Sequence, residues 1–296
     1  MRVNKPSPIL WVSWIAAIWI CLGFLFAQMK TGFDDPGLEK RVAQALAPDN
    51  GRILIVGGSN VIAGVHFGDL AGKLSRPVVD LSIVDEGGDE RILWHYAEAV
   101  TKSGDTVVLS LRSIVAHDPE DISLASSING KLKAQLGPRY APVKLDGAIW
   151  RPLPPISLAQ KLRAVLLHTE TPKTRFTCEE AKGTYDNVPY HSKPELYWSQ
   201  MAQNIARLRS HGVRVVATLP WLRIPPEQQK GLRRLIQEAR EHLAAIDVPV
   251  IEPDDDMAVV KDESLSCDGA HLSRKGAEVH TRYLTKYLKA VLDRQP

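Results

Sequence analysis

Three polar side chains, far apart in the sequence, have the chemistry of a serine nucleophile and its base. The first is Ser59, which follows the apolar run 52–56 and two glycines and directly precedes a helical pattern. A serine at the start of a helix lies where developing negative charge is stabilised, so Ser59 is a candidate nucleophile. The same position also suits a helix N-cap or a phosphate-binding turn, and Ser59 alone does not decide among the three.

The other two candidates are Asp268 and His271, in the run Cys-Asp-Gly-Ala-His-Leu at 267–272. Ser273 follows as a suitable N-cap for a last helix. At this spacing a carboxylate can hydrogen-bond to the imidazole, fix its tautomer and stabilise the imidazolium. The alternatives are a solvated loop or a pair of metal ligands. Other histidines are scattered without metal-binding spacing, and the dinucleotide and P-loop glycine patterns are absent, so we predict neither metal nor cofactor.

Short apolar runs alternate with amphipathic helical patterns from residue 51 onward. The predicted strands are 52–56, 77–83, 106–111, 213–219 and 248–251, and the predicted helices include 61–74, 226–245 and 273–292. This alternation predicts an α/β fold of three layers, with a five-stranded parallel sheet covered by helices on both faces. Ligands bind at the carboxyl ends of such strands. The loops of Ser59 and of Asp268 and His271 both fall on that side.

The two loops together resemble the SGNH (GDSL-like) hydrolase family. Gly-Gly-Ser-Asn at 57–60 is similar to the family's first block, Gly-Asp-Ser-Asn, with Gly58 in place of the aspartate. Asp-Gly-Ala-His-Leu at 268–272 is similar to its last block, Asp-x-x-His. The resemblance covers about residues 51–296. It implies a flavodoxin-like fold and a catalytic triad of Ser59, His271 and Asp268.

The resemblance also implies an oxyanion hole, and here the match is poorer. Its backbone donors would be the N–H of Ser59 and that of a glycine after the second strand, here Gly87 or Gly88. After the third strand the family carries Gly-x-Asn-Asp, whose Asn is a further donor, whereas this chain has Ser-Leu-Arg-Ser at 110–113. Arg112 either supplies that donor or is an ordinary surface or ion-paired arginine.

The N-terminus carries an uncharged apolar stretch at 9–28, long enough as a helix to span roughly 30 Å of bilayer. Arg2 and Lys5 precede this stretch, so the positive-inside rule predicts that residues 1–8 are cytoplasmic. A cleaved signal peptide is the alternative, although no A-x-A site follows. We therefore predict a single-pass inner-membrane anchor, a tether at 29–50 and a periplasmic catalytic domain at 51–296.

A proline-rich insertion at about 116–190 interrupts the alternation of strands and helices. Long irregular segments in compact domains are usually binding loops or lids, and Trp150 and Tyr190 favour a substrate-facing role. Cys178 lies in this insertion, and Cys267 directly precedes the Asp-x-x-His block. Outside the cytoplasm two such cysteines often pair, so we predict a disulfide between them. The alternative is two unpaired, buried thiols.

The anchor and the divergent middle blocks are similar to an envelope branch of the SGNH family, whose members acylate or deacylate cell-surface polymers. The resemblance implies a serine esterase or O-acyltransferase that acts on acetyl esters of a surface polysaccharide or exopolysaccharide. Its partners would be the membrane and other envelope biosynthesis proteins. The alternatives are an inactive SGNH-like module that binds a polymer or acts as a scaffold, and a lipid esterase or thioesterase. The net charge of +3, with lysine and arginine dispersed, predicts no nucleic-acid partner.

Overall fold

A parallel sheet forms the centre of the domain in the computed structural model, which describes residues 14, 18, 37–83, 90–110, 112, 122–143, 185, 190–252 and 258–293. Within these residues the sheet has four strands in the order β2-β1-β3-β4. The strands are β1 (Ile53–Gly57), β2 (Val78–Asp80), β3 (Thr106–Ser110) and β4 (Arg214–Ala217). All three neighbouring pairs are parallel, which confirms the predicted α/β class.

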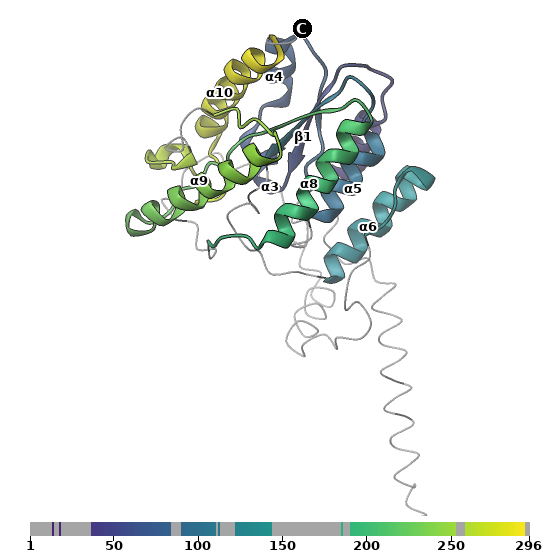
Figure 1. Cartoon of the computed structure of the whole chain (residues 1–296), viewed down its shortest axis with the longest axis horizontal. Coiled ribbons are helices and arrows are strands. Elements are labelled where there is room, and N and C mark those ends of the chain that lie inside the picture. Colours follow the sequence, from purple (N-terminus) through teal and green to yellow (C-terminus); the bar gives the residue numbers. More distant parts are fainter. Residues whose placement is uncertain are drawn as a thin grey trace, which may run out of the picture.

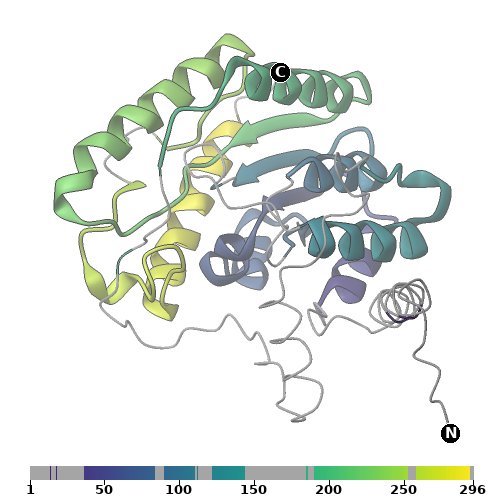
Figure 2. The same cartoon turned by 90° about the horizontal axis from the view of Figure 1, so that it is seen from below.

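Helices cover both faces of the sheet (Figures 1 and 2). Leu54 and Val56 of β1 face a layer formed by α2, α5, α6, α8 and α9, whereas Ile53 and Ile55 face α3, α4 and α10. The strand β1 is therefore apolar and buried at every position, as expected for the centre of a parallel sheet buried on two sides. The helices are α2 (Leu38–Ala45), α3 (Ser59–Gly64), α4 (Phe67–Leu74), α5 (Arg91–Val100), α6 (Ile122–Leu136), α8 (Glu195–Ser210), α9 (Gln229–Ala245) and α10 (Arg274–Asp293). Short 3-10 turns lie at η2 (Gly137–Arg139), η3 (Pro226–Gln228) and η5 (Glu263–Leu265).

The prediction of a fifth strand at 248–251 was wrong, because this segment forms only one isolated bridge to Ala217. The N–H of Ala217 donates to the carbonyl of Pro249 at 2.9 Å, but a proline has no N–H to extend the ladder. The N–H of Leu219, two residues after the end of β4, bonds instead to the carboxylate of Glu252 at 2.9 Å. A side chain thus ends the ladder where a fifth strand would continue.

The second strand runs further toward the carboxyl edge of the sheet than β2 alone. Backbone hydrogen bonds from Leu81 to Ile55 (2.9 Å) and from Ile83 to Gly57 (3.0 Å) continue the parallel ladder. The predicted strand at 77–83 therefore describes the hydrogen-bonded segment well. The chain reaches the edge of the sheet beside the residue that ends β1.

The prediction of an irregular insertion was wrong for residues 122–136, which form α6. Buried side chains on α6 recur at three- and four-residue spacing, the signature of an amphipathic helix: Ala125, Ile128, Leu132 and Leu136. Prolines on either side obscured this signal. The helix α8 was not predicted either, although parallel strands such as β3 and β4 need a crossover connection. The helical patch predicted at 158–167 lies outside the described residues.

A buried ion pair joins the amino ends of β1 and β3. Arg52 Nη2 lies 2.6 Å from Asp105 Oδ2, and neither side chain is exposed. The same guanidinium donates to the carbonyl oxygens of Ala45 (2.5 Å) and Val100 (2.9 Å), which belong to the last residues of α2 and α5. One arginine therefore satisfies the carbonyl ends of two helices at the amino edge of the sheet.

Among the described residues, no helix is long and apolar enough to cross a membrane. Of the predicted anchor at 9–28, the structure describes only Trp14 and Ile18, which are helical and exposed over 62% and 51% of their surface. The anchor remains a prediction.

Candidate active site

Ser59 is the first residue of α3 and follows β1 through a tight turn. A side chain at Gly57 would bring its Cβ to 2.5 Å from the carbonyl oxygen of Ser110 in β3, so only glycine fits there. Gly58 then turns the chain into the helix in an extended conformation. The sequence between strand and helix therefore places the Ser59 hydroxyl at the carboxyl edge of the sheet.

The second part of the site is a tight loop at 266–272. The N–H of Cys267 donates to the carbonyl of His271 at 2.8 Å, which closes the loop. Gly269 lies at its tip with a φ of +88°, a backbone conformation that residues other than glycine rarely adopt. The N–H of this glycine also donates to Ser266 Oγ at 3.2 Å. These bonds give the loop a defined shape before any contact with Ser59.

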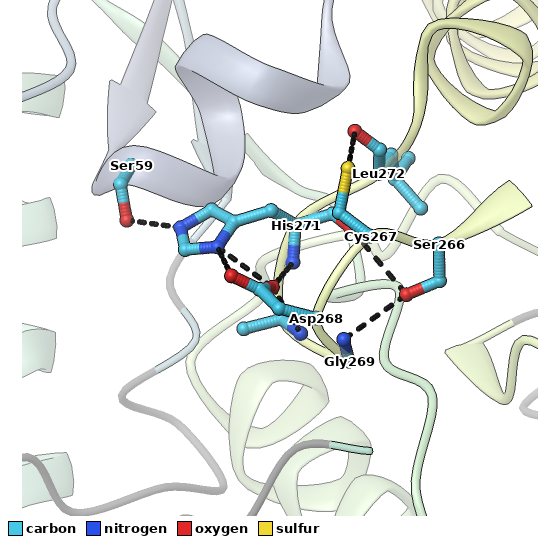
Figure 3. A network of polar contacts seen from close by, with 8 residues as sticks. Ser59, Ser266, Cys267, Asp268, Gly269, His271 and Leu272 are labelled. Carbon is cyan, nitrogen blue, oxygen red and sulfur yellow. Dashed lines mark hydrogen bonds and ion pairs between the residues drawn. The ribbon is translucent and has the colours of Figure 1, made fainter. Parts of the chain in front are cut away.

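The structure brings the three predicted residues together in one hydrogen-bonded chain (Figure 3). His271 Nε2 lies 2.7 Å from Ser59 Oγ, and His271 Nδ1 lies 2.8 Å from both carboxylate oxygens of Asp268. Because an ionised carboxylate only accepts hydrogen bonds, Nδ1 carries the ring proton. Nε2 is then left with the lone pair that can accept the Ser59 proton.

Asp268 is held in its ionised form. Burial raises the pKa of this carboxyl, but a hydrogen bond and charge from the His271 ring and two backbone N–H groups outweigh burial, so the net pKa lies below its ordinary value. The backbone donors are His271 at 3.0 Å and Ala270 at 3.3 Å. At neutral pH the carboxylate can therefore orient the imidazole and stabilise its protonated form.

Ser273 fixes the end of the 266–272 loop to α10. Its hydroxyl accepts a hydrogen bond from the N–H of Gly276 at 3.1 Å and donates to the carbonyl of Ser264 at 2.6 Å. The predicted N-cap is confirmed by the first of these bonds. Through the second bond, the cap also ties the start of α10 to η5.

A loop after β4 supports the 266–272 loop and was not singled out from the sequence. The N–H of Arg223 donates to the carbonyl of Gly269 at 2.7 Å. Its guanidinium pairs with Glu263 at 2.9 Å and lies 4.4 Å from the centre of the Tyr185 ring. The available signal was general: loops after the carboxyl ends of parallel strands collect functional residues.

His280 lies behind the 266–272 loop and links α10 to α3. Its Nδ1 donates to the carbonyl of Gly64, the last residue of α3, at 2.9 Å. Burial lowers the pKa of His280 to about 4, so the ring is neutral near pH 7. The ring packs 4.7 Å from that of Trp221, and neither His280 Nε2 nor Trp221 Nε1 has a hydrogen-bond partner in the part of the chain that the structure describes.

The predicted oxyanion donors are described only in part. Gly87 and Gly88 lie outside the described residues. Arg112 lies two residues beyond Ser110, which pairs with Gly57, so it is at the same sheet edge as Ser59. The roles of these groups and of the Ser59 N–H remain predictions.

The side-chain amide of Asn60 was not assigned a role from the sequence. It donates to the carbonyl of Ser110 at 3.3 Å. This bond joins the first turn of α3 to the end of β3, so it holds the residue after Ser59 against the sheet.

Cys267 is disulfide-bonded in the structure. Its predicted partner, Cys178, lies outside the described residues, so the pairing of the two remains a prediction. Among the described residues, no group of three or more histidine, cysteine, aspartate or glutamate side chains could hold a metal ion.

No family model matches the chain, and no curated protein matches it. Solved structures with a similar arrangement include a putative SGNH hydrolase from Slackia heliotrinireducens, which is 12% identical, with 81% of this chain and 100% of that chain covered and a TM-score of 0.40. A lipase/acylhydrolase from Enterococcus faecalis is 12% identical, with 81% and 96% covered and a TM-score of 0.42. A GDSL-like lipase from Bacteroides thetaiotaomicron is 12% identical, with 86% and 97% covered and a TM-score of 0.43. At these values the likeness carries no argument about function, which must be argued from the site itself.

Proposed function

We propose that the chain is a serine-dependent ester hydrolase or acyltransferase of SGNH type. Ser59 is the nucleophile, His271 is the general base and Asp268 orients the imidazole. The observation that carries this proposal is the hydrogen-bonded chain of the three side chains, with 2.7 Å between Ser59 and His271 and 2.8 Å between His271 and Asp268. Distances of this size are those expected of an activated serine.

The reaction proceeds in two steps through an acyl-serine. Ser59 Oγ attacks the ester carbonyl while His271 Nε2 accepts its proton, and the alkoxide then leaves as an alcohol that takes this proton. In the second step water or a sugar hydroxyl attacks the acyl carbonyl, His271 again accepts the proton, and Ser59 recovers it. The acyl group ends as a free acid or as a new ester, so one intermediate serves hydrolysis and transfer alike.

The negative charge that develops on the carbonyl oxygen needs hydrogen-bond donors. The backbone N–H of Ser59 is the first, and a glycine N–H from the loop after β2, at Gly87 or Gly88, is the second. Arg112, after β3, takes the place of the family's asparagine. Loss of one such donor typically lowers kcat by 10²- to 10³-fold, on the order of 3 to 4 kcal/mol.

For the substrate we propose an acetyl ester of a cell-surface polysaccharide or exopolysaccharide. The predicted anchor and extracytoplasmic domain support an envelope substrate, and other envelope biosynthesis proteins are the proposed partners. A reporter that is active only outside the cytoplasm, fused after residue 296, should be active. A reporter signal from the cytoplasm would contradict both the localisation and the polysaccharide.

A labelling experiment with a matched control tests the nucleophile. The full chain should react with a fluorophosphonate probe and release acetate from para-nitrophenyl acetate and from acetylated glycans. Ser59→Ala should abolish both reactions, whereas Ser210→Ala, at an exposed serine that ends α8, should leave both unchanged. Labelling that persists in Ser59→Ala would refute the assignment. Absence of labelling in the unaltered chain would favour an inactive polymer-binding module.

A further inference from the structure

The direction of α2 shows where the chain enters the domain. At its far end, the carbonyl of Ala45 accepts a hydrogen bond from Arg52, which precedes β1 at the amino edge of the sheet. One turn after its start, Arg41 lies 3.9 Å from Asp80, which ends β2. The helix therefore runs antiparallel to the strands. Leu38, which begins it, lies roughly 5 Å further toward the carboxyl edge than Arg41.

The carboxyl edge is the one that carries the triad. Asp80 pairs in register with Ile55, and Ser59 follows only four residues later. The chain before residue 38 thus arrives at the same edge of the domain as the nucleophile. A chain that entered at the amino edge would place the anchor and the site on opposite sides.

The other end of the described chain lies on the opposite side of the domain. The helix α10 starts three residues after His271 and extends for 20 residues, roughly 30 Å. Near its end the carbonyl of Val291 accepts a hydrogen bond from Arg214, the first residue of β4. Figure 1 accordingly shows the end of α10 away from α3.

The predicted anchor ends close to this entry point. The stretch between residues 28 and 38 reaches at most about 35 Å when fully extended, and about 17 Å on average as a flexible chain. A domain of this length is about 45 Å across. The edge at which α2 begins is therefore the part of the domain held nearest to the bilayer.

We propose that the carboxyl edge of the sheet, with Ser59 and the loop of His271, faces the membrane, and that the ester is presented to it at the bilayer surface. This inference rests on the proposed function and on the predicted anchor. The ester is then one on a polysaccharide that is still anchored in the membrane, whereas a soluble ester reaches the site only by diffusion. Tethering raises the local concentration of the anchored ester to about the millimolar range.

The orientation is tested without any activity measurement. Arg274 and Asp293 are exposed residues at the two ends of α10, at the catalytic and opposite edges. Each is replaced by cysteine in a Cys21→Ser background, labelled with a fluorophore, and reconstituted as the full chain in phosphatidylethanolamine–phosphatidylglycerol vesicles with a headgroup-labelled acceptor lipid. Because the positions lie roughly 30 Å apart, energy transfer should be at least about twofold stronger from residue 274. Equal transfer, or stronger transfer from residue 293, would overturn the proposal.

The consequence for substrate is tested by moving the anchor. In a second chain, residues 1–36 are placed after residue 296, which attaches the opposite edge to the vesicle. Both chains are assayed on soluble 4-methylumbelliferyl acetate and on a long-chain 4-methylumbelliferyl ester embedded in the vesicles. We expect equal turnover of the soluble ester and a loss of about tenfold or more on the embedded ester after relocation.

Equal turnover of the embedded ester by both chains would overturn the inferred mode of substrate delivery. Failure of both chains on the soluble ester would refute the proposed function instead. The energy-transfer result would still decide the orientation of the domain in that case.

Discussion

Glu252 is expected to make the stability of the domain fall as the pH rises. Burial raises the pKa of this carboxyl from 4.5 to about 7, against the opposing effects of hydrogen bonds from Thr218 and Leu219 and the charge of Arg240. The folded state therefore holds a proton that the unfolded state releases at lower pH. The stabilisation is present in full below pH 4.5 and is lost as the pH rises through about 7.

The size of the effect follows from the two pKa values. A change from 4.5 to about 7 corresponds to about 3 kcal/mol in the free energy of unfolding. Glu252→Gln keeps an acceptor oxygen for the Leu219 N–H, 2.9 Å away in the unaltered chain, but cannot ionise. We expect the glutamine variant to lose most of this pH dependence between pH 5 and pH 8. Its free energy of unfolding should therefore rise relative to that of the unaltered chain as the pH increases.

Urea unfolding of the full chain in detergent, measured at intervals from pH 5 to pH 8, gives the free energy of unfolding at each pH. The control is Glu241→Gln, at an exposed glutamate on α9, which should leave the pH dependence as it is. If the Glu252→Gln and unaltered chains show parallel curves over this range, the carboxyl is not protonated in the folded state. The reasoning from burial would then be refuted.

Three further changes should have effects of known direction. Asp105→Ala leaves the buried guanidinium of Arg52 without its carboxylate and should lower the free energy of unfolding by about 3 to 5 kcal/mol in urea titrations; an unchanged midpoint would contradict this. Neutral His280 contributes stability above pH 6.5 that is lost as the pH falls through about 4. His280→Gln should therefore reduce the loss of unfolding free energy on acidification by about 3 kcal/mol. An equally large loss in the variant would argue against burial as the cause. Reduction of the predicted bond between Cys178 and Cys267, which closes a loop of about 90 residues worth about 4 to 5 kcal/mol, should lower both Tm and esterase activity. Since the chain has three cysteines, three free thiols in the denatured, unreduced protein would exclude the bond.

The meeting of Ser59, Asp268 and His271 was predictable because each of the two segments that carry them has a local signal. Ser59 follows a short apolar strand through two glycines, and Asp268 and His271 share one loop before a helix. Parallel strands all present their carboxyl ends at the same edge, so the two loops had to meet there. The order of elements along the chain was enough, without knowledge of any side-chain contact.

Features that depend on contacts between distant segments were not predictable. The 248–251 segment has the composition of a strand, but a proline and the side chain of Glu252 end its pairing. Arg223 supports the 266–272 loop through its backbone N–H, and no residue type reveals that. Glu252 itself lies between the segment at 248–251 and a proline, and nothing in the sequence indicated that its side chain is buried. The helix α6 is a different case, since its apolar spacing was visible but prolines around it favoured an irregular interpretation.

The contact between Ser59 and His271 joins residues 212 positions apart, which affects the order of events during synthesis and folding. Contacts of such separation form late, because the loss of chain entropy on closing so long a loop must be offset by the rest of the fold. Until the last helix has packed, the serine lacks its base and is no more reactive than any other hydroxyl. Under the proposed function, a nascent chain therefore does not hydrolyse esters, and hydrolysis begins only when the domain is complete.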